Sequence, residues 1–425
     1  MTAGEVFRMG RVGTSAVAVA MVLALSPLLA DDLPSYPLRN GDFSIYQGYS
    51  RPAGWALGRE AGRVRLTVDP VPRFPVQKSA VAVVRCETSA QGYIFQDVDL
   101  LDGRWRFRAE VTGSPGSKAR LEISGTKSLQ TPVVTVTGKW QRLEMEIPQV
   151  SGPLRVHLRF QTSGEGEVRF RQARLDAVRL NGAAVPLKSG EVLAGLVLAE
   201  RSTAAERFAV FELQRFLHRM TGRFPGLAGR DHVSDGRRIA IGAAASQDAV
   251  KLLQGLVPDA YVMHRGKTVS TLAGNNGVGT LYAVYEFLKQ QGCRWVMPGD
   301  VGEVIPRRSA LEPVVTRVFE PDYHLVRSVF TGFQQFFPGG GWIYIDVGEL
   351  RDWSLRNRFN SVWSGGATLK WGPDRGHGWV QDSGHSWNAV VAPYGKYFED
   401  HPEWYPLVRG RRMPRSDVSI RLPNQ

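Results

Sequence analysis

The sequence predicts a multidomain protein in which an all-β sandwich is followed by a small α/β domain and a third mixed segment. From about 36 to 180, short runs of alternating apolar and polar residues are separated by Gly, Pro and Ser, with no helical period. From about 191 onward, helical spacing of apolar residues alternates with short apolar runs. The length of 425 residues accommodates roughly two to four domains.

Residues 1–30 have the composition of a signal peptide. Arg8 and Arg11 precede a short apolar run at 14–25, and Ala30 provides a small residue for cleavage. The run is too short to span a bilayer, and no later segment reaches that length. We therefore expect an exported protein, periplasmic or extracellular, with no transmembrane segment after cleavage of the signal.

Strand-like alternation explains where many of the basic residues lie in a chain of net charge +13. RWRFR at 104–108 and RVHLRF at 155–160 each place basic residues on one face of a strand and apolar residues on the other. We interpret this as a solvated arginine face, and the alternative is a basic face that attracts acidic polysaccharide. Nucleic acid is not an expected partner, because the sequence has no recognition-helix pattern or RNA-binding signature.

Cysteine usage predicts no disulfide framework. Cys86 and Cys293 are the two cysteines, they fall in different predicted domains, and neither has metal-ligand spacing. We expect both to be small buried residues.

The predicted sandwich covers 35–182. Its expected strands lie at 64–68, 80–85, 105–111, 121–124, 141–147 and 173–180. Short motifs of this region resemble the galactose-binding-like jelly rolls that are common among carbohydrate-binding modules: NGDF at 40–43, PAGW at 52–55, QDVDL at 96–100, GRWRF at 103–107, GKWQRL at 138–143 and ARLDAVRL at 173–180. The resemblance implies a jelly-roll fold and a sugar-binding role.

Three aromatic residues are candidates for binding that sugar. Tyr46, Tyr49 and Trp55 lie in an early loop-rich stretch, and the apolar face of a pyranose ring stacks on an exposed aromatic side chain. For Trp55, as for Trp140, packing in the core is the alternative role.

A structural Ca²⁺ in the sandwich is a further expectation, although the predicted function requires no cofactor. Asp42 and Asp176 fall near the two chain ends of the region, and carboxylates with neighbouring carbonyl groups suit this hard cation.

The second predicted domain covers 190–308. Thr203 and Glu206 form a capping box for a helix that Gly222 ends. Further elements are expected as strands at 238–242 and 269–273, a turn at 274–277 and a helix over 281–288 that ends before Gly292.

Here the resemblance becomes specific. FELQRFL at 211–217 with MTG at 220–222 looks like the first helix of the accessory domain that precedes the barrel in α-glucuronidases and β-hexosaminidases, and GTLYAVYEFL at 279–288 is similar to its second helix. GCRW at 292–295 and GEVIP at 302–306 complete the pattern of a related family. That family carries a large domain of formerly unknown function, and some of its members are endo-β-N-acetylglucosaminidases.

After an expected linker at 307–320, residues 318–425 resemble the N-terminal part of a (β/α)₈ glycosidase barrel. PDYHLVR at 321–327 is similar to the first strand, and WSLRNRFNSVW at 353–363 to a helix that leads into the second strand. A complete barrel takes about 250 residues, so we expect this one to be incomplete in the chain.

The resemblance also implies substrate contacts. Arg327 would grip sugar hydroxyls from the end of the first strand, with a structural ion pair as the alternative. His385 and Trp387 belong to a glycine-flanked loop expected on the same face, and His377 is a weaker candidate. The catalytic residues are unknown, because no sequence context distinguishes one carboxylate of the segment from another: Asp322, Asp346, Glu349, Asp374, Asp382, Glu399 and Glu403.

These observations predict the N-terminal portion of an exported glycoside hydrolase that cleaves O-glycosyl bonds in a poly- or oligosaccharide, endo-N-acetylglucosaminidase- or α-glucuronidase-like. One alternative is a non-catalytic secreted carbohydrate-binding protein, and another is a structural exported protein with decayed sites.

Overall fold

The computed structural model describes residues 54–69, 80–228, 235–322 and 347–364, with shorter stretches within 38–52, 328–343 and 367–412. The predicted signal peptide at 1–30 lies outside the described residues. Within the described part, no helix is both long enough and apolar enough to cross a membrane.

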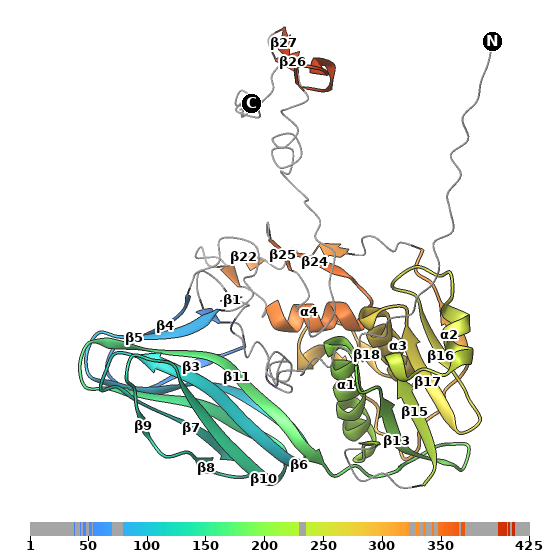
Figure 1. The fold of residues 1–425 in the computed structure, drawn as a ribbon, viewed down its shortest axis with the longest axis horizontal. Coiled ribbons are helices and arrows are strands. Elements are labelled where there is room, and N and C mark those ends of the chain that lie inside the picture. Colours follow the sequence, from blue (N-terminus) through green and yellow to red (C-terminus); the bar gives the residue numbers. More distant parts are fainter. Residues whose placement is uncertain are drawn as a thin grey trace, which may run out of the picture. The chain divides into compact units, whose positions relative to one another are not determined.

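The first part of the chain is an antiparallel β-sandwich (Figure 1). Its strands are β1 (Tyr46–Gln47), β2 (Arg51–Pro52), β3 (Ala56–Ala61), β4 (Val64–Asp69), β5 (Val81–Cys86), β6 (Ala90–Gly113), β7 (Lys118–Gly125), β8 (Leu129–Gln130), β9 (Val134–Thr135), β10 (Gln141–Thr162) and β11 (Gly166–Leu180). All six strands expected from the sequence are present.

Two long strands organise the sandwich. β6 and β10 pair with each other along nearly their whole lengths, interrupted by register shifts between Ile147 and Gly152. The first half of β6 also pairs with β3 and its second half with β11, while the second half of β10 pairs with β7. The irregularity lets both strands pass from one layer to the other, as bulges and bends do at sandwich corners.

The core of the sandwich follows the predicted alternation. Trp105 and Phe107 are 1% and 0% exposed, whereas Arg106 lies on the outer surface beside Glu144 and Glu146. The predicted arginine face is solvated only in part, because Arg106 and Arg155 are 40% and 39% exposed but Arg108 and Arg159 only 15% and 16%. Carboxylates accompany its cations.

The second part is a mixed α/β domain. Its sheet has the order β12-β13-β15-β17-β16-β20, with β14 beside β13. β13, β15 and β17 run parallel to one another, whereas β16 runs antiparallel to both of its neighbours, β17 and β20. The elements are β12 (Val185–Pro186), β13 (Val192–Leu198), α1 (Ala204–Thr221), β14 (Gly226–Leu227), β15 (Arg237–Ile241), α2 (Gln247–Leu253), β16 (Tyr261–His264), β17 (Val269–Gly274), α3 (Gly277–Gln290), β18 (Arg294–Trp295), β19 (Glu303–Val304) and β20 (Arg317–Phe319).

Helices cover both faces of this sheet. α1 and α3 share one hydrophobic core with the inward side chains of the strands, including Tyr261 and Leu272. α2 packs on the opposite face, against Val262 and Ala273. Tyr261 and Val262 are consecutive, as are Leu272 and Ala273, and they point to opposite faces because successive side chains of a strand alternate.

Local sequence signals set the ends of the two long helices. Thr203 caps α1 and Glu206 returns the hydrogen bond, as predicted, and Gly222 ends the helix in the left-handed conformation. The side chain of Asn276 caps α3 by accepting a hydrogen bond from the Gly279 amide at 2.7 Å.

The segment after the α/β sheet contains one β-α-β unit. β21 (Ser328–Phe330) pairs in parallel with β24 (Ser361–Ser364), and α4 (Val347–Arg356) lies between them in the sequence. The remaining elements are β22 (Gln335–Phe336), β23 (Trp342–Ile343), β25 (Ala367–Leu369), β26 (Leu407–Val408) and β27 (Arg411–Arg412). Among the described residues these strands do not close into a barrel.

The expected linker at 307–320 is part of the α/β domain instead. Its end forms β20, which pairs with β16, and Leu311 is fully buried. The run VVTRVF at 314–319 is rich in apolar residues, but it is too short for periodicity alone to distinguish a strand from a linker.

Candidate functional site

The sandwich residues predicted to bind ligands have mixed placements. Trp55 is 7% exposed and packs on Phe43, with ring centroids 5.3 Å apart, so the core role fits this side chain. Tyr46 opens β1, but its side chain lies outside the described residues, as do Tyr49 and Asp42.

Asp176, the second residue of the predicted calcium site, accepts a hydrogen bond from Arg108 at 2.6 Å. Its carboxylate thus already has a cationic partner. No group of three or more candidate metal ligands occurs among the described residues.

The residues predicted from the barrel resemblance are mostly outside the described part. This holds for Arg327, His385, Trp387 and His377, and for the carboxylates Asp346, Asp374 and Asp382. Of the others, Glu349 is half-buried, while Asp322, Glu399 and Glu403 are exposed. Their placement does not mark any of them as a catalytic acid.

Two aromatic side chains stand on the outer face of the sandwich instead. Tyr93 and Phe95 of β6 are half-buried, with ring centroids 5.6 Å apart. His157, which faces Phe95 in the neighbouring strand β10, lies 4.8 Å from the Tyr93 ring in an edge-on arrangement. With Arg155 and Arg159, these residues form a surface that we call the aromatic face.

The two arginines of the aromatic face cover its rings. The guanidinium carbon of Arg155 lies 4.1 Å from the centre of the Phe95 ring, and that of Arg159 lies 5.2 Å from the centre of Tyr93. Such cation–π contacts contribute about 0.5–1 kcal/mol at exposed sites. They hold the guanidinium groups over the two rings.

Carboxylates neutralise both cations. Asp97 accepts two hydrogen bonds from Arg155, at 2.6 and 2.9 Å. Glu60 and Glu122 accept from Arg159 at 2.5 and 3.2 Å. The aromatic face therefore carries many hydrogen-bonding groups and little net charge.

His157 is buried beneath the arginines and rings, at 5% exposure. Its Nε2 lies 2.8 Å from the Ser124 hydroxyl, and its Nδ1 is buried without a hydrogen-bond partner in the described part of the chain. Burial lowers the pKa of His157, and the opposing effect of Glu122 does not offset it. The imidazole is therefore neutral at pH 7 and supplies one donor and one acceptor.

A glycine makes room for the Tyr93 ring. A Cβ atom at Gly58 of β3 would overlap the edge of that ring, so the ring lies directly over the β3 backbone. The orientation of Tyr93 therefore depends on the absence of a side chain at 58.

The sugar-binding candidates predicted from the sequence lie in the early loop-rich stretch, and none of them belongs to the aromatic face. A signal was available, because Tyr93 and Phe95 have the same parity as the polar residues Gln91 and Asp97, while Ile94 points into the core. Two neighbouring aromatic residues on the polar face of an alternating strand are the signal in the sequence that could have pointed to this surface.

Comparisons with known proteins found similarity over part of the chain. No protein-family model matches the chain, and no curated protein matches it. Three solved carbohydrate-binding modules are similar over about a third of it. One is TmCBM61 in complex with β-1,4-galactotriose, with 17% sequence identity, a TM-score of 0.28 and coverage of 33% of this chain and 97% of that one. Another is a CBM4, with 12% identity, a TM-score of 0.24 and coverage of 32% and 97% of the two chains. The third is the CBM22-1 xylan-binding domain of Paenibacillus barcinonensis Xyn10C, with 14% identity, a TM-score of 0.24 and coverage of 32% and 90%.

Proposed function

We propose that the sandwich binds an oligosaccharide on its aromatic face. The observation that carries the proposal is the pair Tyr93 and Phe95, whose rings stand side by side on an outer sheet surface and are only half-buried. Adjacent rings on a sheet offer apolar surfaces on which pyranose rings stack, and the nearby polar groups orient the hydroxyls.

The charge of the face points to the kind of glycan. Arg155 and Arg159 are both paired with carboxylates, so the face has little excess positive charge to attract an acidic polysaccharide. Paired guanidinium and carboxylate groups instead offer donors and acceptors together, which suits a hydroxyl group that both donates and accepts. The proposed ligand is therefore a neutral oligosaccharide.

Binding has a modest cost in this arrangement. A sugar ring that stacks on Phe95 must move the Arg155 guanidinium aside, which forfeits a cation–π contact of about 0.5–1 kcal/mol. Arg155 can keep its two hydrogen bonds to Asp97, and another N–H of its guanidinium can then donate to a sugar hydroxyl.

A glycan-binding panel with purified variants tests this proposal. Tyr93→Ala and Phe95→Ala should each abolish or strongly weaken binding of the neutral oligosaccharide that the unaltered chain retains. Trp140→Ala is a matched control, because Trp140 is also partly exposed, at 37%, and carries Arg171 at 4.0 Å from its ring centre. Loss of binding in the Trp140 variant alone would place the site elsewhere and overturn the proposal.

As a second candidate function, we propose that the chain is the N-terminal portion of an exported glycoside hydrolase. The parallel pairing of β21 with β24 around α4 supports it, because β-α-β units of this kind build (β/α)₈ barrels. The test is hydrolysis of N-glycans and glucuronoxylan fragments by the chain and by a form extended through any downstream coding sequence. Inactivity of both forms would contradict this second function and leave the binding proposal standing.

A further inference from the structure

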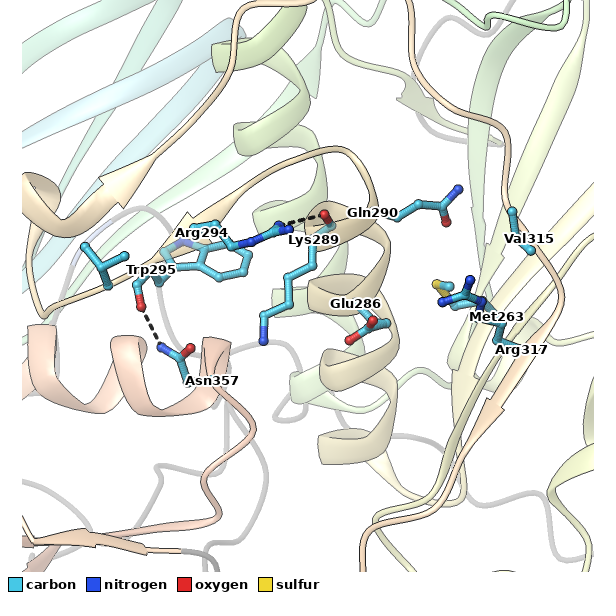
Figure 2. Close-up of a pocket in the computed structure, with 10 residues that line it drawn as sticks. Met263, Glu286, Lys289, Gln290, Arg294, Trp295, Val315, Arg317 and Asn357 are labelled. Carbon is cyan, nitrogen blue, oxygen red and sulfur yellow. Dashed lines mark hydrogen bonds between the residues drawn. The ribbon is translucent and has the colours of Figure 1, made fainter.

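A cavity of about 520 Å³ opens in the α/β domain beside the C-terminal half of α3. Figure 2 shows Glu286, Lys289 and Gln290 projecting from this helix, with Arg294 and Trp295 on one side and Arg317 on the other. The volume lies within the range of about 300–1,000 Å³ that is typical of small-molecule sites.

The cavity gathers three cations. Lys289 comes from α3, Arg294 from the start of β18 and Arg317 from the edge strand β20. In the described part of the chain, neither Lys289 nor Arg317 forms an ion pair with a carboxylate. Arg294 donates to main-chain oxygens of Lys289 and Cys293, at 2.8 and 2.7 Å, which leaves its charge uncompensated.

One carboxylate also lines the cavity, but it is already engaged. Glu286 accepts a hydrogen bond from Arg358 at 2.9 Å. The pair Glu286–Arg358 is neutral as a unit, so the excess positive charge of Lys289, Arg294 and Arg317 remains.

This arrangement differs from that of the sandwich surface. There, arginines such as Arg106, Arg155 and Arg159 meet carboxylates within hydrogen-bonding distance. Arg294 and Arg317 are exposed and Lys289 is half-buried, so solvent screens part of the repulsion between them. Three cations without carboxylate partners around one concave site still give it a positive potential that attracts an anion.

Two buried polar atoms of the cavity wall also lack partners. Trp295 is 4% exposed, and its indole N–H makes no hydrogen bond among the described residues; the same holds for the side-chain oxygen of Gln290. Both atoms are closed off from solvent within the packed wall, so they are not contacts for a ligand in the cavity, and the site rests on its three cations.

We propose that this cavity binds a small organic anion whose carboxylate, sulfate or phosphate group is held by Lys289, Arg294 and Arg317. A bare oxyanion would fill only part of the volume, so the group is carried on a larger polar body such as a sugar. Met263, Val296 and Val315 supply the apolar wall for that body. The proposal concerns a site separate from the aromatic face and does not rest on it.

Calorimetric titration of the full chain tests the proposal, in a Tyr93→Ala, Phe95→Ala background that removes sugar binding at the aromatic face. The probes are glucuronate, glucose 6-phosphate, inorganic phosphate and glucose at low ionic strength. We expect the two acidic sugars to bind and glucose not to bind, and we expect added salt to weaken binding. Each charge-assisted contact that is removed should weaken binding by about tenfold or more.

The variants are Arg317→Met and Lys289→Met. Arg317 is exposed, so its variant should fold even if the Lys289 variant does not. Lys267→Met and Arg223→Met are matched controls on exposed residues of the same domain outside the cavity. The proposal would be overturned if glucose bound as tightly as glucuronate, or if no probe bound at all. It would also be overturned if the control substitutions weakened binding of the acidic sugars as much as the cavity substitutions do. Equal affinity for inorganic phosphate would identify a bare oxyanion and overturn the inference of a larger body.

Discussion

Arg356 at the end of α4 donates a hydrogen bond to the Glu212 carboxylate in α1 at 3.0 Å, across 144 residues of the chain. Both side chains are nearly inaccessible, with 8% and 2% exposure. Arg356 also donates to Glu303 at 2.8 Å, so one guanidinium joins α4 to two separate elements of the α/β domain. The helix of the β-α-β unit is therefore anchored in the core of the preceding domain.

Replacing Arg356 by Met should destabilise the protein strongly. The substitution leaves Glu212 and Glu303 buried with fewer compensating charges, and breaking a buried ion pair from one side costs about 3–5 kcal/mol. Urea denaturation measures the change in the free energy of unfolding. Lys188→Met is the control, because its ion pair with Glu312 is exposed and should contribute less than about 1 kcal/mol. Similar losses in both variants would contradict the anchoring role.

The same cluster predicts a dependence of stability on pH. Burial favours the protonated form of Glu303, but Arg356, Arg215 and Arg219 outweigh it and hold the pKa below its ordinary value of 4.5. A carboxyl group with a lowered pKa in the folded state stabilises the protein above its unfolded pKa, and this contribution is lost as the pH falls through the folded pKa. Glu303→Gln should therefore flatten the acid limb of a plot of unfolding free energy against pH. An unchanged slope below pH 4.5 would show that Glu303 is not responsible.

Local signals and long-range contacts differ in how well the sequence predicted them. The capping box of Thr203 and Glu206 was predictable because both partners lie within one helical turn. The strands at 105–111 and 141–147 were expected as short elements, yet they belong to β6 and β10, which continue through Gly103 and Gly152. A glycine typical of turns also permits a bulge inside a strand, and only the neighbouring strands decide between the two.

The candidate sites were less predictable for the same reason. The cations of the α/β cavity come from 289, 294 and 317, and no spacing pattern connects the third to the first two. The pairing of Arg356 with Glu212 is similarly invisible in the sequence, because it depends on the packing of α4. The sugar-stacking candidates predicted from the sequence lie in an early loop-rich stretch, whereas the proposed stacking residues Tyr93 and Phe95 lie within a strand.

The two cysteines should resist modification until the protein unfolds. Cys86 and Cys293 are both free and buried, which confirms the expectation from the sequence. Burial raises the pKa of both thiols, that of Cys293 to about 12, so little reactive thiolate is present at neutral pH. A chromogenic disulfide reagent should react only slowly with the native protein. In denaturant it should react readily with both thiols. Rapid labelling of one thiol in the native protein would reveal local opening around that cysteine.

Gly58→Ala tests whether the orientation of Tyr93 matters for glycan binding. The added Cβ would overlap the edge of the Tyr93 ring, which must then turn away from β3. The Tyr93 ring is still present in this variant, so any loss of affinity is caused by the change in the position of the ring. We expect a loss of roughly 1 kcal/mol, about fivefold in Kd, with little change in stability.

Gly164→Ala is the matched control for that substitution. Gly164 lies in the connection between β10 and β11, and a Cβ there would meet nothing within 4 Å. Equal affinities of the two variants and the unaltered chain would mean that the ring binds in either orientation. A loss of binding in Gly58→Ala alone would show that the glycan needs Tyr93 flat over the β3 backbone, beside Phe95. The glycine at 58 would then be a specificity-determining position of the aromatic face, although it has no side chain with which to contact the ligand.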